Sequence, residues 1–259
     1  MNHVLIATPS YDRKVFSIYM QSIIEYITNT DLNISYLIPE PDSLVTRSRN
    51  EIFTRFYENI ESSDFTHLLW QDSDIYMNAY GLQKMISYNL DVIGQACPLK
   101  CPTTDYGISC AVAYVYDQID YYLYKTEYVG TGILLLSKQA VYDIVDFCEK
   151  TNAWYWDMSS NKKIYDVFKV GIDKHKIYQS EDWYLCSLLR SIGKEVYVDS
   201  SGETIHAGYG RRSMPINPES IMGSYQATLS ESDRHLYWTP NDWLGRITYS
   251  DDSIDNHGN

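Results

Sequence analysis

The stretch THLLWQDSDI, residues 66–75, joins the apolar run Leu68–Trp70 to a pair of aspartates. A short apolar run that stops at turn-forming residues is typical of a strand buried in a sheet. Asp and Ser favour the turn that ends such a strand. The sequence therefore predicts a buried strand that delivers Asp72 and Asp74 to one edge of a sheet. A plain strand-ending turn is the alternative interpretation of this triplet.

The first hundred residues alternate between strand-like and helix-like patterns. This alternation is typical of a parallel sheet covered by helices. Ser43 and Asn78 are expected to cap the second and third helices. The expected strands are 3–9, 33–38, 66–71 and 91–97, and the expected helices are 13–28, 44–59 and 78–88.

The pattern changes after residue 100, where three strands are expected in succession with little helix between them. Helices and one short strand follow, and the chain loses periodicity after Gly208. The expected fold class is α/β, a mostly parallel sheet flanked by helices with a small antiparallel part. The later elements are strands 108–116, 121–126, 128–137 and 195–198, and helices 138–150 and 181–191, the last ended by Gly193.

One domain is expected, because neither an internal repeat nor a linker divides the chain. It would span residues 1–249, followed by a disordered acidic tail at 250–259. Within it the pattern of elements changes near residue 100 and becomes irregular after residue 208.

Composition narrows the class of partner. The 259 residues carry a formal net charge of −13, which disfavours a nucleic-acid backbone and suits a site for a divalent cation. The chain has 25 Tyr but 6 Phe. Tyrosine suits partly wet polar clefts such as those that bind sugars, although a biased composition explains the count equally well.

The cysteines and the apolar runs predict a soluble cytoplasmic protein. The five cysteines are odd in number and lack the spacing of a zinc site, which indicates reduced, buried thiols. The N-terminus has no pattern of a signal peptide. No stretch reaches the roughly 18 apolar residues of a membrane span.

Polar motifs recur along the chain, and the two that follow strands at 9–13 and 72–74 are expected to converge on one edge of the sheet, because ligands of open α/β sheets bind beyond the carboxyl ends of the strands. Two carboxylates separated by one residue can reach a single hard cation such as Mg²⁺ or Mn²⁺. Such an ion can hold a diphosphate. The motifs are PSYDR at 9–13, RSRN at 47–50, DSD at 72–74, VGTG at 129–132, SEDW at 180–183 and His206.

This ordered set resembles the GT-A glycosyltransferases, near glycosyltransferase family 2 and of phage, large-virus or bacterial type. The resemblance covers about residues 3–210. It implies a UDP- or GDP-sugar donor, Mn²⁺ or Mg²⁺, and a hydroxyl-bearing acceptor. It also implies a nucleotide-binding half at 1–100, an acceptor and catalytic half at 101–207, and a C-terminal lid or acceptor segment at 208–249. A glycan is the favoured acceptor, while a lipid-linked sugar, a protein hydroxyl and a hydroxymethylated DNA base stay open.

The resemblance also implies a role for each matching position. Asp182, or else Glu181, would act as the general base of an inverting transferase. Asp74 would bind the metal, with Asp72 at the metal or the ribose and His206 as a further metal ligand. Residues implied at the donor are Thr8, Pro9, Ser10, Tyr11, Asp12, Arg47, Arg49, Asn50, Asp72, Ser73, Gly130, Thr131, Gly132, Arg211 and Arg212.

Each role has a purely structural explanation that competes with it. Arg47 and Arg49 do not share a helix face, so at least one can be a solvated side chain. Acidic residues near the start of a helix, such as Glu181 and Asp182, complement its dipole whatever the function. The glycines at 130 and 132 can mark a bulge, and His206 can be an ordinary residue at a strand end.

Competing functional classes stay open as well. A retaining GT-A enzyme would share the aspartates and the late histidine but lack a dedicated base. The motifs are also compatible with a sugar nucleotidyltransferase and with a non-catalytic module that binds nucleotide-sugars. A haloacid-dehalogenase phosphatase is disfavoured, because its aspartates follow the first strand and here they follow the third.

Overall fold

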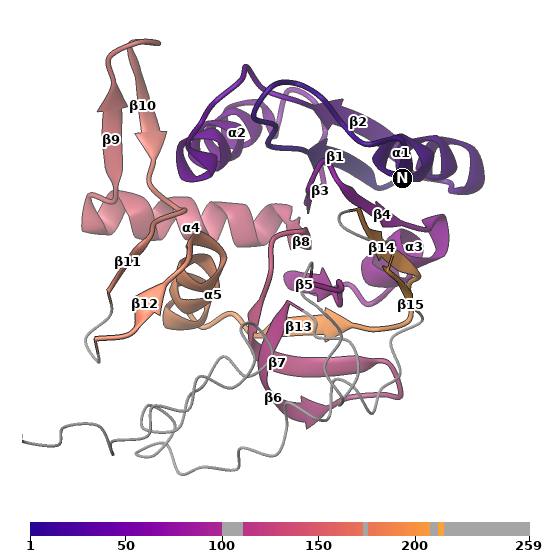
Figure 1. Cartoon of the computed structure of the whole chain (residues 1–259). Helices are drawn as coiled ribbons and strands as arrows, with labels where there is room; N and C mark the ends of the chain where they lie inside the picture. Colours follow the sequence, from indigo (N-terminus) through magenta and orange to yellow (C-terminus); the bar gives the residue numbers. More distant parts are fainter. Residues whose placement is uncertain (100–110, 173–175, 208–211, 215–259) are drawn as a thin grey trace, which may run out of the picture.

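The computed structural model describes residues 1–99, 111–172, 176–207 and 212–214. An eight-stranded sheet lies at its centre (Figure 1). Across the sheet the strands are β2 (Asn33–Leu37), β1 (His3–Ala7), β3 (His67–Gln71), β8 (Ile133–Ser137), β5 (Val92–Gln95), β13 (Val196–Asp199), β7 (Leu123–Val129) and β6 (Val112–Gln118).

Most strands of this sheet point the same way. β1 pairs in parallel with β2 and β3, and β13 pairs in parallel with β5. β8 is antiparallel to both of its neighbours, and so is β7. Only β7 and β8 therefore oppose the common direction of this sheet, which confirms the predicted α/β class with an antiparallel part.

Helices cover both faces of the sheet. Because side chains alternate along a strand, Leu5 and Ala7 face one helix layer while Val4 and Ile6 face the other. The first layer holds α2 (Val45–Asn59), α4 (Lys138–Thr151) and α5 (Glu181–Ser191), and the second holds α1 (Ser17–Asn29) and α3 (Ala79–Ser87).

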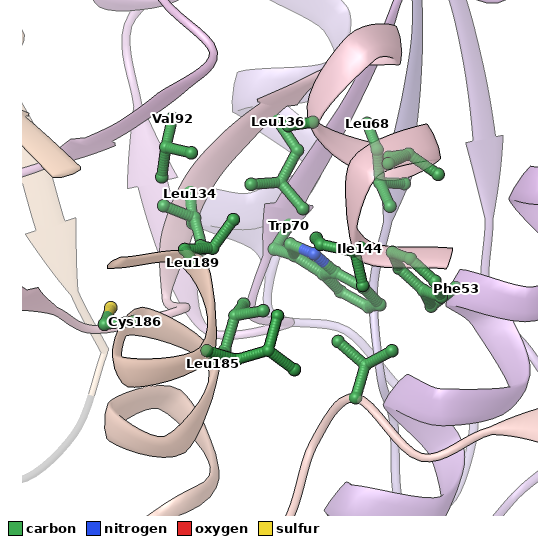
Figure 2. Packing of buried hydrophobic residues seen from close by; sticks show 14 of the residues in the cluster. Phe53, Leu68, Trp70, Val92, Leu134, Leu136, Ile144, Leu185, Cys186 and Leu189 are labelled. Carbon is green, nitrogen blue, oxygen red and sulfur yellow. The ribbon is translucent and has the colours of Figure 1, made fainter. Parts of the chain in front are cut away.

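Trp70 is the largest fully buried side chain of the first layer. Figure 2 shows it close to Phe53 of α2 and Ile144 of α4, and its ring meets Phe168 edge-on at a centroid distance of 5.0 Å. Truncation of a side chain of this size in a core typically costs about 3–5 kcal/mol. The strand that carries the two aspartates is thus firmly anchored in the core.

The structure adds short strands that the sequence pattern did not predict. β4 (Ile75–Met77), β14 (Thr204–His206) and β15 (Arg212–Met214) form a separate antiparallel sheet. Two small antiparallel pairs join β9 (Trp154–Asp157) to β10 (Lys162–Tyr165) and β11 (Gly171–Ile172) to β12 (Tyr178–Gln179). Segments of two to four residues carry too little periodicity to be recognised in sequence.

Two helix starts differ from the prediction. α1 begins at Ser17 instead of Arg13, whose φ of 62° is incompatible with a right-handed helix. The predicted cap at Ser43 is wrong, since the N-cap position of α2 is Leu44 and Asp42 accepts the Leu44 N–H instead. Asn78 caps α3 as predicted, and Gly193 ends α5 with a φ of 82°.

Three of the cysteines lie in the described part of the chain, and Cys97, Cys148 and Cys186 are all buried free thiols, as expected. Within that same part, none of the helices combines the length and the apolar character needed to cross a bilayer. Apart from β15, the predicted lid segment 208–249 and the acidic tail 250–259 lie outside the described residues.

Candidate active site

The aspartate triplet forms a hydrogen-bonded turn between β3 and β4. The Ile75 N–H donates to the Asp72 carbonyl at 3.1 Å, and the Asp72 N–H donates to the Gly132 carbonyl at 3.0 Å. The Phe16 N–H donates to the Ser73 carbonyl at 2.9 Å, which ties the segment after β1 to this turn. The predicted convergence of these two strand ends is confirmed.

Arg49 connects three parts of the site from its place on α2. Its side chain is only 4% exposed. Nη2 donates to Asp72 Oδ1 at 2.8 Å, while Nη1 donates to Glu181 Oε1 at 2.9 Å and to the Thr131 hydroxyl. The guanidinium therefore joins the β3–β4 turn, the segment after β7 and the start of α5, and it neutralises part of their negative charge.

The segment Gly130–Gly132 passes between two carboxylates. A Cβ atom added to Gly132 would lie 3.7 Å from Asp72 Oδ2 and 2.7 Å from Ile75 Cδ1. One added to Gly130 would lie 3.6 Å from Asp182 Oδ2 and 2.8 Å from the Cβ of Ala111. Only glycine fits at these close approaches without displacing its neighbours. Residues 130–132 connect β7 to β8 and are not a bulge within a strand.

Asp182 is buried in the first turn of α5. Burial raises the pKa of its carboxyl group, and the negative charge of Glu181 adds to that, while Ser180 and Arg49 oppose it. The Ser180 hydroxyl and the Trp183 N–H, the latter at 2.8 Å, both donate to Oδ1. A carboxylate with a raised pKa is suited to accept a proton near neutral pH.

Asp74 and His206 are brought together by the small sheet. His206 of β14 lies opposite Ile75 of β4, and the Ala207 N–H donates to the Asp74 carbonyl at 2.8 Å. His206 Nε2 lies 3.5 Å from Asp74 Oδ1. The other ring nitrogen, Nδ1, is 2.7 Å from the Pro98 carbonyl, which can only accept, so Nδ1 carries the proton. In the neutral ring Nε2 then has its lone pair available to a metal.

These residues fit a metal that is shared with a substrate better than one enclosed by protein. Asp72 Oδ1 is engaged by Arg49, and Asp74 Oδ1 lies 3.5 Å from His206 Nε2. Across the described residues, no group of three or more His, Cys, Asp or Glu side chains is placed to hold an ion. Mg²⁺ is commonly bound by one or two carboxylates, with phosphates and water completing its shell.

The segment after β1 divides into inward and outward residues. Thr8 is buried and its hydroxyl lies 2.6 Å from the Tyr19 hydroxyl. Ser10 is also buried and donates to the Lys14 carbonyl. Tyr11 is 74% exposed, and Asp12 forms an exposed ion pair with Lys14. Of the predicted donor residues in this segment, Tyr11 and Asp12 are therefore the ones open to a ligand, and Pro9 is partly buried.

Two of the residues predicted at the donor, Arg47 and Asn50, make their contacts away from the carboxylates of Asp72, Asp74 and Asp182. Arg47 makes a bidentate contact with Asp42, at 2.6 and 2.7 Å. The Asn50 amide group is engaged by residues 166–168 through four hydrogen bonds. Arg211 lies outside the described residues, and the backbone of Arg212 pairs with His206 in β15.

The sequence did not reveal two contacts that shape the site. Ser180 stands two residues before Asp182 at the start of a helix, and that spacing is a recognisable signal for a side chain that bonds the acid. The Pro98 carbonyl that orients His206 had no signal, because its role depends on a backbone contact between residues 108 positions apart.

Comparisons with known proteins yield structural likenesses only. No family model matches the chain, and no curated protein matches it. A197 from STIV shares 16% identity, with 85% of this chain and 92% of that chain covered and a TM-score of 0.47. GalNAc-T7, solved with UDP, GalNAc and Mn²⁺, shares 7% identity, covering 79% and 43%, with a TM-score of 0.48.

A glycosyltransferase involved in the glycosylation of the major capsid of PBCV-1 shares 17% identity, covering 58% of this chain and 69% of that one, with a TM-score of 0.33. Nucleotidyltransferases match as well. With identities this low and TM-scores below 0.5, these likenesses do not carry a functional assignment. A functional assignment therefore has to rest on the side chains of the site.

Proposed function

We propose that this chain is a metal-dependent glycosyltransferase that moves a sugar from a UDP- or GDP-sugar to a hydroxyl group of an acceptor. One observation carries the proposal. The Asp74–His206 pair and the buried carboxylate of Asp182 belong to the same sheet edge, and the glycine-bordered segment 130–132 separates Asp72 from Asp182. A candidate pair of metal ligands and a buried acid are the groups that metal-dependent inverting transfer requires.

Each of these groups would have its own task. Asp74 and His206 would hold Mn²⁺ or Mg²⁺, which when bound neutralises charge on the diphosphate of the departing nucleotide. Asp182 would accept the proton of the acceptor hydroxyl. The deprotonated oxygen then bonds to the anomeric carbon as the bond from that carbon to the diphosphate oxygen breaks, so the configuration inverts.

The rest of the site would bind the donor. Tyr11 and Asp12 are exposed in the segment after β1 and would meet the nucleoside. The lack of side chains at Gly130 and Gly132 would let the sugar approach the backbone. We further propose that residues 1–249 form one catalytic domain, with Arg211 and Arg212 in the segment that covers the donor. Buried free thiols suit the reducing cytoplasm, where we place the protein.

Calorimetric titration with UDP- and GDP-sugars, with and without Mn²⁺, tests the proposal. Binding of one donor class is expected to depend on Mn²⁺ and to be lost in Asp74→Ala. Asp182→Asn should retain that binding but lose transfer, since only the proton acceptor is removed. Metal-independent binding of the donor, or the absence of any nucleotide binding, would contradict the proposal.

Product analysis separates inverting transfer from retaining transfer and from nucleotide-sugar synthesis. Inversion at the anomeric carbon, measured by NMR of the first product formed, is expected if Asp182 is the base. Retention together with an active Asp182→Asn variant would instead indicate a retaining transferase. Formation of a nucleotide-sugar from a nucleoside triphosphate and a sugar 1-phosphate would indicate a nucleotidyltransferase.

A further inference from the structure

A second pocket, with a volume of about 390 Å³, lies beside the start of α2. The carboxylates and the histidine of the proposed active site do not line it. Its walls come from three places in the chain: the first turns of α2, strand β9 and the segment 166–170. The lining includes Arg47, Asn50, Tyr155, Asp166, Phe168 and Lys169.

The pocket is separated from the active site by a shared wall. Arg49 and Asn50 are neighbours on α2, and Arg49 binds the active-site acids while Asn50 lines the pocket. The Arg49 guanidinium carbon lies 5.8 Å from the centroid of the Phe168 ring, which also lines the pocket.

The charges around the pocket are balanced. Arg47 is paired with Asp42 at 2.6 Å, and Lys169 is paired with Asp166 at 3.0 Å. These pairs leave no excess of positive charge to hold an anion. The Arg47, Lys169 and Asp166 side chains nevertheless keep exposed fractions of 54%, 35% and 29%, so their polar atoms can be reached from solvent.

The same walls offer both donors and acceptors beside an aromatic ring. Hydrogen bonds to charged groups are among the stronger ones in proteins, at roughly 1.5–3 kcal/mol. Tyr155 contributes a ring with a hydroxyl group, while Phe168, only 1% exposed, closes the pocket from behind. A neutral ligand that carries many hydroxyl groups on a compact apolar ring matches this combination, and that description fits a sugar.

We propose that this pocket binds one sugar unit of an oligosaccharide acceptor, at a distance from the unit whose hydroxyl group is glycosylated. The inference rests on the proposed transferase function and specifies its acceptor as a glycan of at least two units. Arg47, which the sequence placed at the donor, then belongs to the acceptor side of the protein.

The test compares two tryptophan substitutions in the full chain. Val170 lines the pocket and is 52% exposed, so Val170→Trp fills the pocket from its rim without disturbing the core. Ile172, two residues along, is 62% exposed and does not line the pocket, so Ile172→Trp is the matched control. Saturation-transfer NMR with glucose, galactose, mannose and N-acetylglucosamine, without donor, measures sugar binding directly.

At least one of these sugars is expected to bind the unmodified chain and Ile172→Trp, and to lose binding in Val170→Trp. With oligosaccharide acceptors, Val170→Trp should raise the acceptor KM about tenfold, equivalent to about 1.4 kcal/mol. Hydrolysis of the donor without acceptor should not change, because that reaction does not involve this pocket.

The outcomes distinguish this inference from the proposed function. If transfer occurs but Val170→Trp equals Ile172→Trp in sugar binding and in acceptor KM, the pocket is not an acceptor site while the transferase assignment stands. If none of the four sugars binds the unmodified chain, the inference is overturned as well. If sugar binding is lost in Val170→Trp but no donor binds with Mn²⁺, the pocket binds sugars and the transferase assignment fails.

Discussion

Asp72 and Asp74 stand two residues apart in one turn, yet the structure gives them different surroundings. Asp72 meets the buried guanidinium of Arg49 at 2.8 Å, and Asp74 faces His206 at 3.5 Å. Burial raises the pKa of Asp72, and Arg49 opposes that rise. The difference shows that the spacing of two acids does not assign their roles, because the partner that each one meets decides what it can bind.

The Asp72 side of the turn is an ion-pair cluster, whereas the Asp74 side is the cation site that we propose. On the Asp72 side one arginine serves two carboxylates, which holds α2 and α5 against the end of β3. On the Asp74 side, His206 bonds the Pro98 carbonyl through Nδ1 and places Nε2 next to a carboxylate. The two sides should therefore respond to substitution in different ways.

The largest expected difference is in turnover. Asp74→Asn should lower kcat/KM by about a thousandfold, since losing the ion that stabilises the leaving diphosphate removes several kcal/mol of transition-state stabilisation. Asp72→Asn should lower it less, because Asp72 is already neutralised by Arg49. Steady-state kinetics under saturating Mn²⁺ measure both, and equal losses in the two variants would contradict the division of roles.

The next effect is on stability. Arg49→Met should lower the free energy of unfolding by about 3 kcal/mol, the low end for a broken buried ion pair, because Asp72 and Glu181 keep exposed fractions of 32% and 20%. Denaturant unfolding measures it. Arg47→Met is the matched control and should cost less than about 1 kcal/mol, as its own side chain is 54% exposed. Similar losses in both variants would contradict a stabilising role for the buried ion pairs of Arg49.

A smaller effect is expected on the metal requirement. His206→Gln should raise the Mn²⁺ concentration needed for half-maximal activity by at least about tenfold, since loss of an outer-shell partner alone costs about 10–100-fold in metal affinity. Activity should recover at high Mn²⁺, because Asp74 is still present. Activity measured over a Mn²⁺ series checks this, and an unchanged requirement would leave His206 as an ordinary residue at a strand end.

The smallest expected effect is a shift in the pH dependence. A general base works only when deprotonated, so kcat/KM should fall as the pH drops through the pKa of Asp182, which burial raises above its ordinary 3.8. The Ser180 hydroxyl lowers that pKa, so Ser180→Ala should move the acid limb to higher pH. A pH–rate profile with the limb unmoved, or moved to lower pH, would argue against Asp182 as the base.

Much of the scaffold could be predicted, and the reasons are local. The buried strand before Asp72, the cap at Asn78 and the helix end at Gly193 follow from hydrophobic runs and from single-residue preferences. The small sheet that carries His206 could not be predicted, because its strands have three residues each and β14 pairs with β4 across more than a hundred positions of sequence.

The same limit applies to individual side chains of the site. Arg47 and Arg49 look equivalent in sequence, but one lies beside the second pocket and the other is buried among acids. The direction in which each side chain points is set by the rotation of α2 between the two residues and by the elements that pack against each face of this helix. The bonds from Asn50 to residues 166–168 depend equally on a segment more than a hundred positions away.

The sequence by itself determined which residues could do chemistry and that Asp72 and Asp74 end a buried strand, because hydrophobic runs, turn formers and acid pairs act over a few residues. Only the tertiary structure decided that Arg49 would take Asp72, that His206 would meet Asp74, and that Arg47 would line a second pocket. Those outcomes depend on contacts between distant segments, which form when the sheet and its helices pack together.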